Sequence, residues 1–229
     1  MKTHENLLTF PAIDTEAPAQ FETATFALGW FWGPDSQFGS IHGVIRTRVG
    51  YAGGTSPNPT YYKMGDHAES IQIDFDPKVI SYEDLLKIFW ESHAPVRPAW
   101  SRQYMSGIFY HDDMQKELAI KTRDQQAAFL KREIHTEIAE LDRFYMAEDY
   151  HQKYYLQQDY ELMSNFQRIY PEMVNFTAST AVARVNGYVG GNVSAQFVAN
   201  EVRKLGLSEE NENRLKKLAA RKFAASCRL

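Results

Sequence analysis

The fold is decided by the stretch Thr25-Phe26-Ala27-Leu28-Gly29-Trp30-Phe31-Trp32-Gly33-Pro34. A short apolar run meets Gly29, three aromatic residues follow, and Gly33-Pro34 marks a place where a helix can begin. Proline is tolerated in a first helical turn, because its missing N–H would be an unpaired donor there. We therefore expect a strand, a sharp turn and a helix start, with residue 30 near the positive end of the helix dipole.

Position 30 suits an anion or a thiolate, because the unpaired N–H groups of a helix N-terminus favour negative charge. The residue present is Trp30, which offers one N–H donor and no nucleophile. An alternative interpretation is that Trp30, Phe31 and Trp32 simply pack in a hydrophobic core. The stretch alone leaves both interpretations open.

The composition is that of an ordinary globular protein, with 229 residues of which 44% are hydrophobic and 24% charged. The net charge of -4 and the isoelectric point near 6.0 give no reason to expect nucleic acid or an anionic membrane as a partner. No run approaches the ~18 apolar residues of a membrane-spanning helix. The first twenty residues are too acidic for a secretory signal or a transit peptide, so we expect a cytoplasmic protein.

The chain has one cysteine, Cys227, third from its end. A single cysteine excludes an intramolecular disulfide and a dithiol relay within one chain. The terminal Cys227-Arg228-Leu229 resembles a degenerate Ser-Lys-Leu signal, which makes a peroxisomal location an alternative to the cytoplasm.

Apolar periodicity and turn signals predict an α+β fold, a mixed sheet with helices packed on it. Ile71, Ile73 and Phe75 alternate with polar residues on one strand, and Ser81 with Asp84 predicts a capping box. The expected strands are 21–28, 44–49, 70–75, 105–110 and 136–141. The expected helices are 33–42, which begins at Gly33-Pro34, and 81–92, 114–133 and 148–156.

The second part of the chain is helical in character. We expect an irregular N-terminal arm over 1–21, an α+β domain over 22–158 and a helical C-terminal extension over 159–229. The extension's expected helices are 161–170, 179–188, 195–205 and one after Ser208. The last helix carries a short apolar stripe, which permits a dimer but does not argue a coiled coil. The stripe consists of Leu215, Leu218, Ala219 and Phe223.

Gly29-Trp30-Phe31-Trp32-Gly33 resembles the Gly-Cys-Phe-Trp-Gly signature of the A-type peptide methionine sulfoxide reductases (MsrA), with tryptophan in place of the cysteine. Further segments stand in the order and roughly the spacing of that family, so the resemblance covers residues 22–158. They are Gly50-Tyr51-Ala52-Gly53-Gly54, Pro57-Asn58-Pro59-Thr60-Tyr61, His67-Ala68-Glu69, Phe75-Asp76-Pro77, Ser81-Tyr82-Glu83-Asp84-Leu85-Leu86 and Gln103-Tyr104. The resemblance implies a ferredoxin-like, split βαβ core.

The resemblance also implies roles for the matching residues. Phe31 and Trp32 match the residues that hold the sulfoxide methyl group. Glu69 matches the glutamate that protonates the sulfoxide oxygen, which requires a pKa raised by burial. Tyr61 and Tyr104 match two tyrosines whose hydroxyls hydrogen-bond that oxygen. The implied ligand is methionine sulfoxide or an oxidised protein, with no bound cofactor and an external thiol such as thioredoxin or dithiothreitol as reductant.

Two departures weaken the enzymatic interpretation. The family nucleophile is a thiolate, and the indole of Trp30 cannot replace it and can narrow the pocket. The family's aspartate before the second tyrosine aligns loosely with Ala99. Cys227 offers a thiol, but from the end of the chain and without the helix dipole.

Other kinds of site find weak support. A metal site on His67 and Glu69, or on His111, Asp112 and Asp113, matches no known ligand spacing, so we expect none. The glycines of residues 50–54 lack the lysine and the following helix of a phosphate loop.

Three hypotheses remain. The first is a non-catalytic relative, a pseudoenzyme that binds methionine sulfoxide in a regulatory role. The second is an active methionine-S-sulfoxide reductase in protein repair under oxidative stress, which uses Cys227 or an external thiol. The third is an interaction protein that works through its C-terminal helices.

Overall fold

The computed structural model describes residues 10–226, with side chains through residue 221. Its centre is a six-stranded sheet in the order β5-β4-β1-β3-β2-β6. The paired strands are antiparallel except β4 and β5, which run parallel, so the sheet is mixed. The strands are β1 (Glu22–Leu28), β2 (Val44–Ala52), β3 (Ala68–Phe75), β4 (Ser106–Tyr110), β5 (Glu137–Glu140) and β6 (Tyr145–Met146).

The core of the fold is the succession β1-α2-β2-β3-α3-β4, with α2 at Trp32–Gly39 and α3 at Tyr82–Glu91. Because β1 lies between β4 and β3, this is the split βαβ, ferredoxin-like arrangement. The predicted α+β class is confirmed. The capping box of α3 is also confirmed, since the Asp84 N–H donates to Ser81 Oγ and the Ser81 N–H donates to the Asp84 carboxylate.

Strand β3 is buried on both faces. Ile71, Ile73 and Phe75 pack in a hydrophobic cluster with residues of β1 and α3, as their alternation predicted. The opposite face carries Asp74, whose carboxylate accepts hydrogen bonds from Arg46 and Arg48. Glu69 is two residues before Ile71, so the period of two places it on the same face as the isoleucines.

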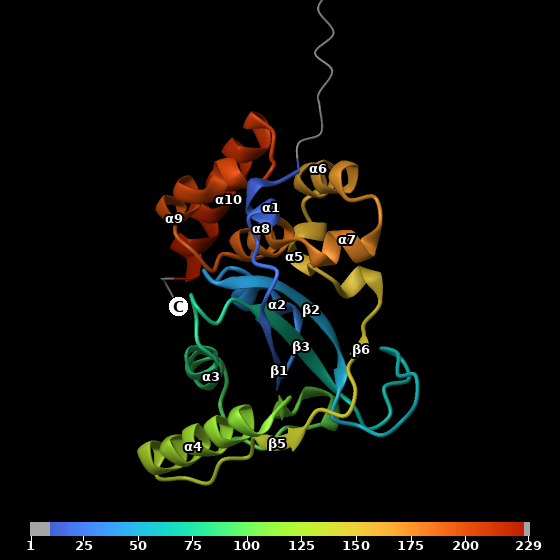
Figure 1. The fold of residues 1–229 in the computed structure, drawn as a ribbon, viewed down its shortest axis with the longest axis vertical. Coiled ribbons are helices and arrows are strands. Elements are labelled where there is room, and N and C mark those ends of the chain that lie inside the picture. Colours follow the sequence, from blue (N-terminus) through green and yellow to red (C-terminus); the bar gives the residue numbers. More distant parts are fainter. Residues whose placement is uncertain (1–9, 227–229) are drawn as a thin grey trace, which may run out of the picture.

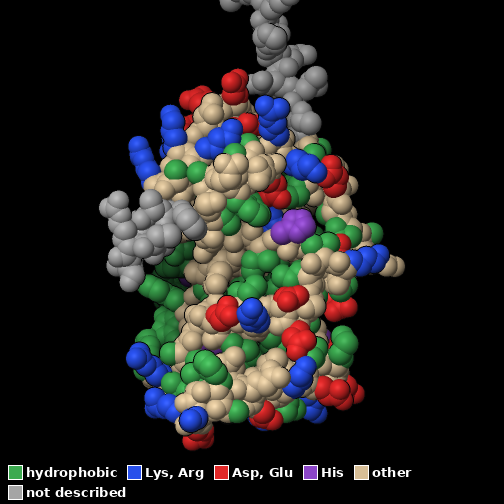
Figure 2. Space-filling model, turned by 90° about the vertical axis from the view of Figure 1, so that its left-hand side faces the viewer, with side chains coloured by type: hydrophobic (Ala, Val, Ile, Leu, Met, Phe, Trp, Pro, Cys, Tyr) green, Lys and Arg blue, Asp and Glu red, His purple; other side chains and the backbone are tan. Residues whose placement is uncertain are grey.

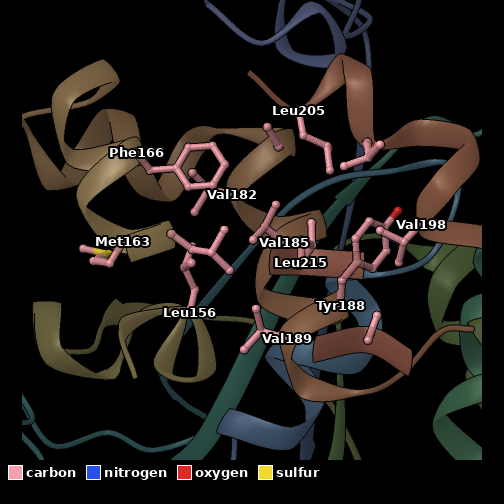
Figure 3. Packing of buried hydrophobic residues seen from close by; sticks show 14 of the residues in the cluster. Leu156, Met163, Phe166, Val182, Val185, Tyr188, Val189, Val198, Leu205 and Leu215 are labelled. Carbon is pink, nitrogen blue, oxygen red and sulfur yellow. The ribbon is translucent and has the colours of Figure 1, made fainter. Parts of the chain in front are cut away.

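The C-terminal helices share one hydrophobic cluster, in which Phe166, Val182 and Leu215 are fully buried (Figure 3). Figure 1 shows α6–α10 grouped at the upper end of the sheet, with α3 and α4 (Asp113–Leu130) at the lower left. The apolar stripe of the last helix, at Leu215 and Ala219, packs inside the chain's own core. The helices are α5 (Tyr154–Gln157), α6 (Tyr160–Ile169), α7 (Met173–Ala178), α8 (Thr180–Gly190), α9 (Ala195–Glu201) and α10 (Glu209–Ser226).

Helix α8 packs closely against α2. A Cβ on Gly39 would lie 2.7 Å from the carbonyl oxygen of Ala183, and one on Gly187 would lie 2.6 Å from Cβ of Ser40. The two helices approach this closely because glycines stand at their contact. The helical part therefore braces the helix that follows the decisive stretch.

Two predicted helices differ in the structure. The helix expected from Gly33-Pro34 through His42 begins close to its expected start, at Trp32, but ends earlier, at Gly39. The helix expected over 148–156 is split into a 3-10 turn, Asp149–His151, and α5. The break is at Lys153, whose φ of 52° is left-handed. Tertiary contacts outweigh the helical propensity there, because Lys153 N–H and Nζ both donate to Asp35.

The N-terminal arm was expected to be irregular, but it contains the short helix α1 (Ala12–Thr15). The short elements α7 and β6 had no prediction. Helix α1 places Asp14 at the start of α8, where its carboxylate accepts hydrogen bonds from Ser179 Oγ at 2.6 Å and Ala181 N at 2.8 Å. The N-terminal arm thus caps a helix about 165 residues away in sequence, which no local signal reveals.

The face drawn in Figure 2 carries Lys and Arg side chains interspersed with Asp and Glu side chains. Among the described residues no helix is long and apolar enough to cross a membrane. The Cys227-Arg228-Leu229 tail and the side chain of Phe223 lie outside the described part of the chain.

Candidate functional site

The turn between β1 and α2 brings Trp30 to the surface. Gly29 has a φ of 88°, a conformation that favours glycine, and α2 begins two residues after Trp30. The indole of Trp30 is 57% exposed and stacks on Trp32 at 5.2 Å between ring centroids. Of the three aromatic residues in this stretch only Phe31 is fully buried. Trp30 therefore lies on the surface of the site rather than in the hydrophobic interior.

Glu69 is a fully buried carboxyl beside this turn. Its Oε2 accepts a hydrogen bond from the Phe31 N–H at 3.1 Å, and its Oε1 accepts one from Gln103 Nε2 at 2.9 Å. Burial raises the pKa of Glu69, and the two hydrogen bonds only partly oppose that effect. The carboxyl therefore keeps its proton to a higher pH than an exposed glutamate, as a general acid requires.

Tyr61 and Tyr104 lie together next to this carboxyl. Burial, together with the Tyr61 hydroxyl, raises the pKa of Tyr104 to about 12, and the charge of Glu69 adds to the shift. The phenol of Tyr104 is therefore protonated at neutral pH and can donate a hydrogen bond. Ala99, the loosely aligned position of the family's aspartate, is exposed on the preceding loop and offers no polar group.

Phe31, Trp32 and Tyr61 belong to one apolar cluster. Trp32 also stacks on Tyr154 of α5, with 3.7 Å between centroids and 5° between planes. The structure thus brings together the predicted residues Phe31, Trp32, Glu69, Tyr61 and Tyr104, with Trp30 at their margin.

Sequence reasoning missed His151, which holds Trp32. Trp32 Nε1–H donates to His151 Nδ1 at 3.1 Å, so the neutral imidazole carries its proton on Nε2. Burial lowers the pKa of His151 and favours this neutral form. Among the described residues Nε2 has no hydrogen-bond acceptor, and Oε2 of Glu148 lies 4.0 Å away. A buried donor is therefore free beside the ring of Phe31.

Glu148 was also missed, and it fixes the position of Tyr61. Its carboxylate accepts hydrogen bonds from the Tyr51 hydroxyl at 2.7 Å and the Tyr61 N–H at 3.0 Å. Burial opposes its ionisation, but these hydrogen bonds outweigh burial and hold the pKa of Glu148 below its ordinary value. The available signal was the acidic, Tyr- and His-rich character of residues 148–156.

Asp35 anchors α2 beneath the site. Its buried carboxylate accepts hydrogen bonds from Thr47 Oγ1 at 2.6 Å and from Lys153 Nζ at 2.9 Å. Lys153 is fully buried, and its Nζ also donates to the Thr47 carbonyl at 2.6 Å. Burial lowers the pKa of Lys153, and the charge of Asp35 counteracts that effect. This buried pair joins α2 to β2 and to the start of α5.

The other candidate residues have structural partners. His67 Nδ1 accepts from the Gly54 N–H at 3.2 Å, and His67 Nε2 lies 2.8 Å from the Ser56 carbonyl oxygen. His111 Nε2 lies 2.9 Å from Thr25 Oγ1. Residues 10–226 contain no group of three or more His, Cys, Asp and Glu placed to hold a metal.

A family profile described as peptide methionine sulfoxide reductase matches residues 22–184, more than half of the chain. The chain belongs to this family. Among curated relatives, a peptide methionine sulfoxide reductase of Drosophila melanogaster is 50% identical over 138 residues, which are 58% of this chain and 54% of that protein. Peptide methionine sulfoxide reductase MsrA of Methanococcoides burtonii is 47% identical over 144 residues, which are 58% of this chain and 94% of that protein.

Solved MsrA structures share the fold. Methionine sulfoxide reductase A of Corynebacterium diphtheriae superposes with a TM-score of 0.56 at 30% identity, over 62% of this chain and 77% of that one. Reduced Mxr1 from Saccharomyces cerevisiae gives a TM-score of 0.57 at 27% identity, over 67% of this chain and 91% of that one. The chain spans about half the length of the Drosophila relative, and the family match includes Glu148, His151 and the first turn of α8.

Proposed function

We propose that this member of the peptide methionine sulfoxide reductase family binds methionine sulfoxide in oxidised polypeptides without reducing it through a thiol of its own. It is a non-catalytic or strongly impaired relative with a binding or regulatory role. The observation that carries the proposal is Trp30, which stands at the signature's cysteine position beside Glu69, the buried acid.

The missing step is nucleophilic attack. In thiol-dependent reduction a thiolate attacks the sulfoxide sulfur, the oxygen takes up protons and leaves as water, and two thiols become a disulfide. The indole N–H of Trp30 is a hydrogen-bond donor without a nucleophilic lone pair, so it cannot begin this sequence.

The residues proposed to bind methionine sulfoxide are retained in this chain. The hydroxyls of Tyr61 and Tyr104, and Glu69 in its protonated form, which burial favours, are donors for a sulfoxide oxygen, which is a strong acceptor. Phe31 and Trp32 supply apolar ring surface for the S-methyl group, since sulfur–aromatic contacts are favourable. Neither binding nor thiol-dependent reduction needs a bound cofactor.

The second candidate is an active methionine-S-sulfoxide reductase in protein repair. The names of the relatives favour it. Its thiol would come from Cys227 or from an external reductant such as thioredoxin or dithiothreitol. A thiol from either source lacks the fixed orientation of a residue at position 30, so its effective concentration at the sulfoxide is lower.

The test combines calorimetric binding of N-acetyl-methionine-S-sulfoxide amide with turnover in dithiothreitol. The parent protein is expected to bind without turnover, and Trp30→Cys is expected to turn over. The mass of the tryptic peptide that contains residue 30 verifies that the assayed protein carries tryptophan there. Turnover by the parent that Cys227→Ser abolishes would establish the second candidate. Absence of binding in both proteins would remove the proposal.

A further inference from the structure

Four exposed aromatic residues each contact a different residue of the candidate site. Trp30 stacks on Trp32, and the other three rings contact Tyr61, Tyr104 and His151 at 5.5, 4.9 and 4.1 Å between centroids. We call these four residues the aromatic collar: Trp30, Tyr62, Trp100 and Tyr150, which are 57%, 91%, 82% and 49% exposed.

Single exposed apolar side chains are common on protein surfaces and need no explanation. The collar differs because its members come from four separate loops or turns, at residues 30, 62, 100 and 150. Each of them contacts a residue of the same candidate site. Their inner neighbours are also connected: His151 contacts Trp32 at 5.7 Å and Tyr61 at 4.7 Å. Exposed aromatic surface is therefore continuous with the residues that hold the sulfoxide.

We infer that the aromatic collar binds the apolar side chains that flank a methionine sulfoxide in an unfolded polypeptide segment. This inference rests on the proposed function and names the substrate class of the same site. A sulfoxide oxygen on Glu69 places the methionine side chain inward, so the adjoining residues of the polypeptide must lie outside, where the collar is. Tyrosine and tryptophan are the side chains that supply such contacts at little conformational cost.

The charges near the collar favour an apolar occupant. The collar rings are neutral, and the charged residues next to them in sequence are Lys63 and Asp149, one of each sign. These two sequence neighbours together favour neither an acidic nor a basic partner. Apolar side chains next to a methionine are normally inside a folded protein, so a segment that presents them together with an oxidised methionine is an unfolded one.

The test uses two five-residue peptides with a central methionine-S-sulfoxide, one flanked by Leu and Phe and the other by Gly and Ser. Binding to the full chain is measured by calorimetry. We expect the apolar peptide to bind roughly tenfold more tightly than the Gly/Ser peptide. Tyr62→Ser and Trp100→Ser should each weaken the apolar peptide by roughly 2- to 10-fold and leave the Gly/Ser peptide unchanged.

Phe129→Ser is the matched control, because Phe129 is 80% exposed on α4 and is not a collar residue. It should bind both peptides as the parent does. Circular dichroism verifies that Tyr62→Ser and Trp100→Ser remain folded.

Four results would overturn the inference. Equal affinity for the two peptides would leave the proposed function intact and remove the collar's role. Unchanged affinity in both Tyr62→Ser and Trp100→Ser would do the same. If the parent protein self-associates and Tyr62→Ser does not, the collar binds a second copy of the chain instead. If neither peptide binds, the proposed function itself has failed, and the inference fails with it.

Discussion

Replacing Lys153 with methionine is expected to destabilise the protein strongly, because the lysine neutralises a carboxylate that water does not reach. Lys153 is 0% exposed and Asp35 is 0% exposed. Methionine has nearly the same length and no charge, so the substitution removes the ion pair with little change in volume. It also removes the hydrogen bond from Nζ to the Thr47 carbonyl, which is 2.6 Å long.

The expected cost is about 3–5 kcal/mol, the range for breaking a buried ion pair by removal of one partner. The low end is favoured here, because Asp35 keeps hydrogen bonds from Thr47 Oγ1 and from the main-chain N–H of residue 153. In a chain of this size each kcal/mol moves Tm by ~2–4 °C, so Lys153→Met should lower Tm by roughly 6–20 °C. The double variant Asp35→Asn/Lys153→Met should recover part of the loss, because no buried charge is then left unpaired.

Thermal unfolding followed by circular dichroism measures the effect at pH 7. Lys204→Met is the matched control, since Lys204 Nζ lies 2.8 Å from Glu16 in a pair whose side chains are 54% and 58% exposed. Exposed pairs contribute little, so the control should melt with the parent. The reasoning is refuted if Lys153→Met and Lys204→Met shift Tm equally, or if the double variant is less stable than Lys153→Met.

Three further predictions concern the site and its supporting helix. The turnover of Trp30→Cys should fall as the pH rises through the raised pKa of Glu69, because only the protonated carboxyl donates a proton to the sulfoxide oxygen. Adding Glu69→Gln should remove this fall at high pH and lower kcat/KM by about 10²–10⁴-fold. Both effects are measured as kcat/KM against pH. Gly39→Ala should cost about 1–3 kcal/mol in urea unfolding, because its Cβ would lie 2.7 Å from a carbonyl oxygen of α8. Nitrogen-15 NMR should find the proton of His151 on Nε2 and a pKa below the ordinary ~6.5, and protonation of Nδ1 at neutral pH would contradict the hydrogen bond from the indole.

The periodic parts of the fold could be predicted from the sequence. The alternation in residues 70–75 and the capping box at Ser81 are local signals, and β3 and α3 lie where those signals place them. The elements that were missed or displaced depend on distant partners. Lys153 interrupts a helical segment because Asp35, 118 residues away, binds its main chain and side chain. Local propensity carries no information about that pairing.

The candidate site likewise has one part that the sequence predicted and one part that it did not. Residues Phe31, Trp32, Glu69, Tyr61 and Tyr104 were found through motifs, and the structure brings them together. Of their supports, Gln103 was noted only as part of the Gln103-Tyr104 segment and given no role, and Glu148 and His151 were missed. A single polar residue in a sequence does not reveal whether its partner is water or a buried carboxyl. Burial raises the pKa of Glu69, and the hydrogen bond from Trp32 decides the tautomer of His151. Both are properties of the assembled fold.

The hydrogen bonds that support the proposed binding site do not depend on the side chain of residue 30. Glu69 is held by the main-chain N–H of Phe31 and by Gln103, and Trp32 is held by His151. None of these hydrogen bonds involves the side chain of residue 30, which is more than half exposed. Exchange of a small residue for tryptophan there removes no hydrogen bond that fixes the acid or the apolar rings. The side chain at position 30 and the architecture of the proposed binding site are therefore separable in this fold.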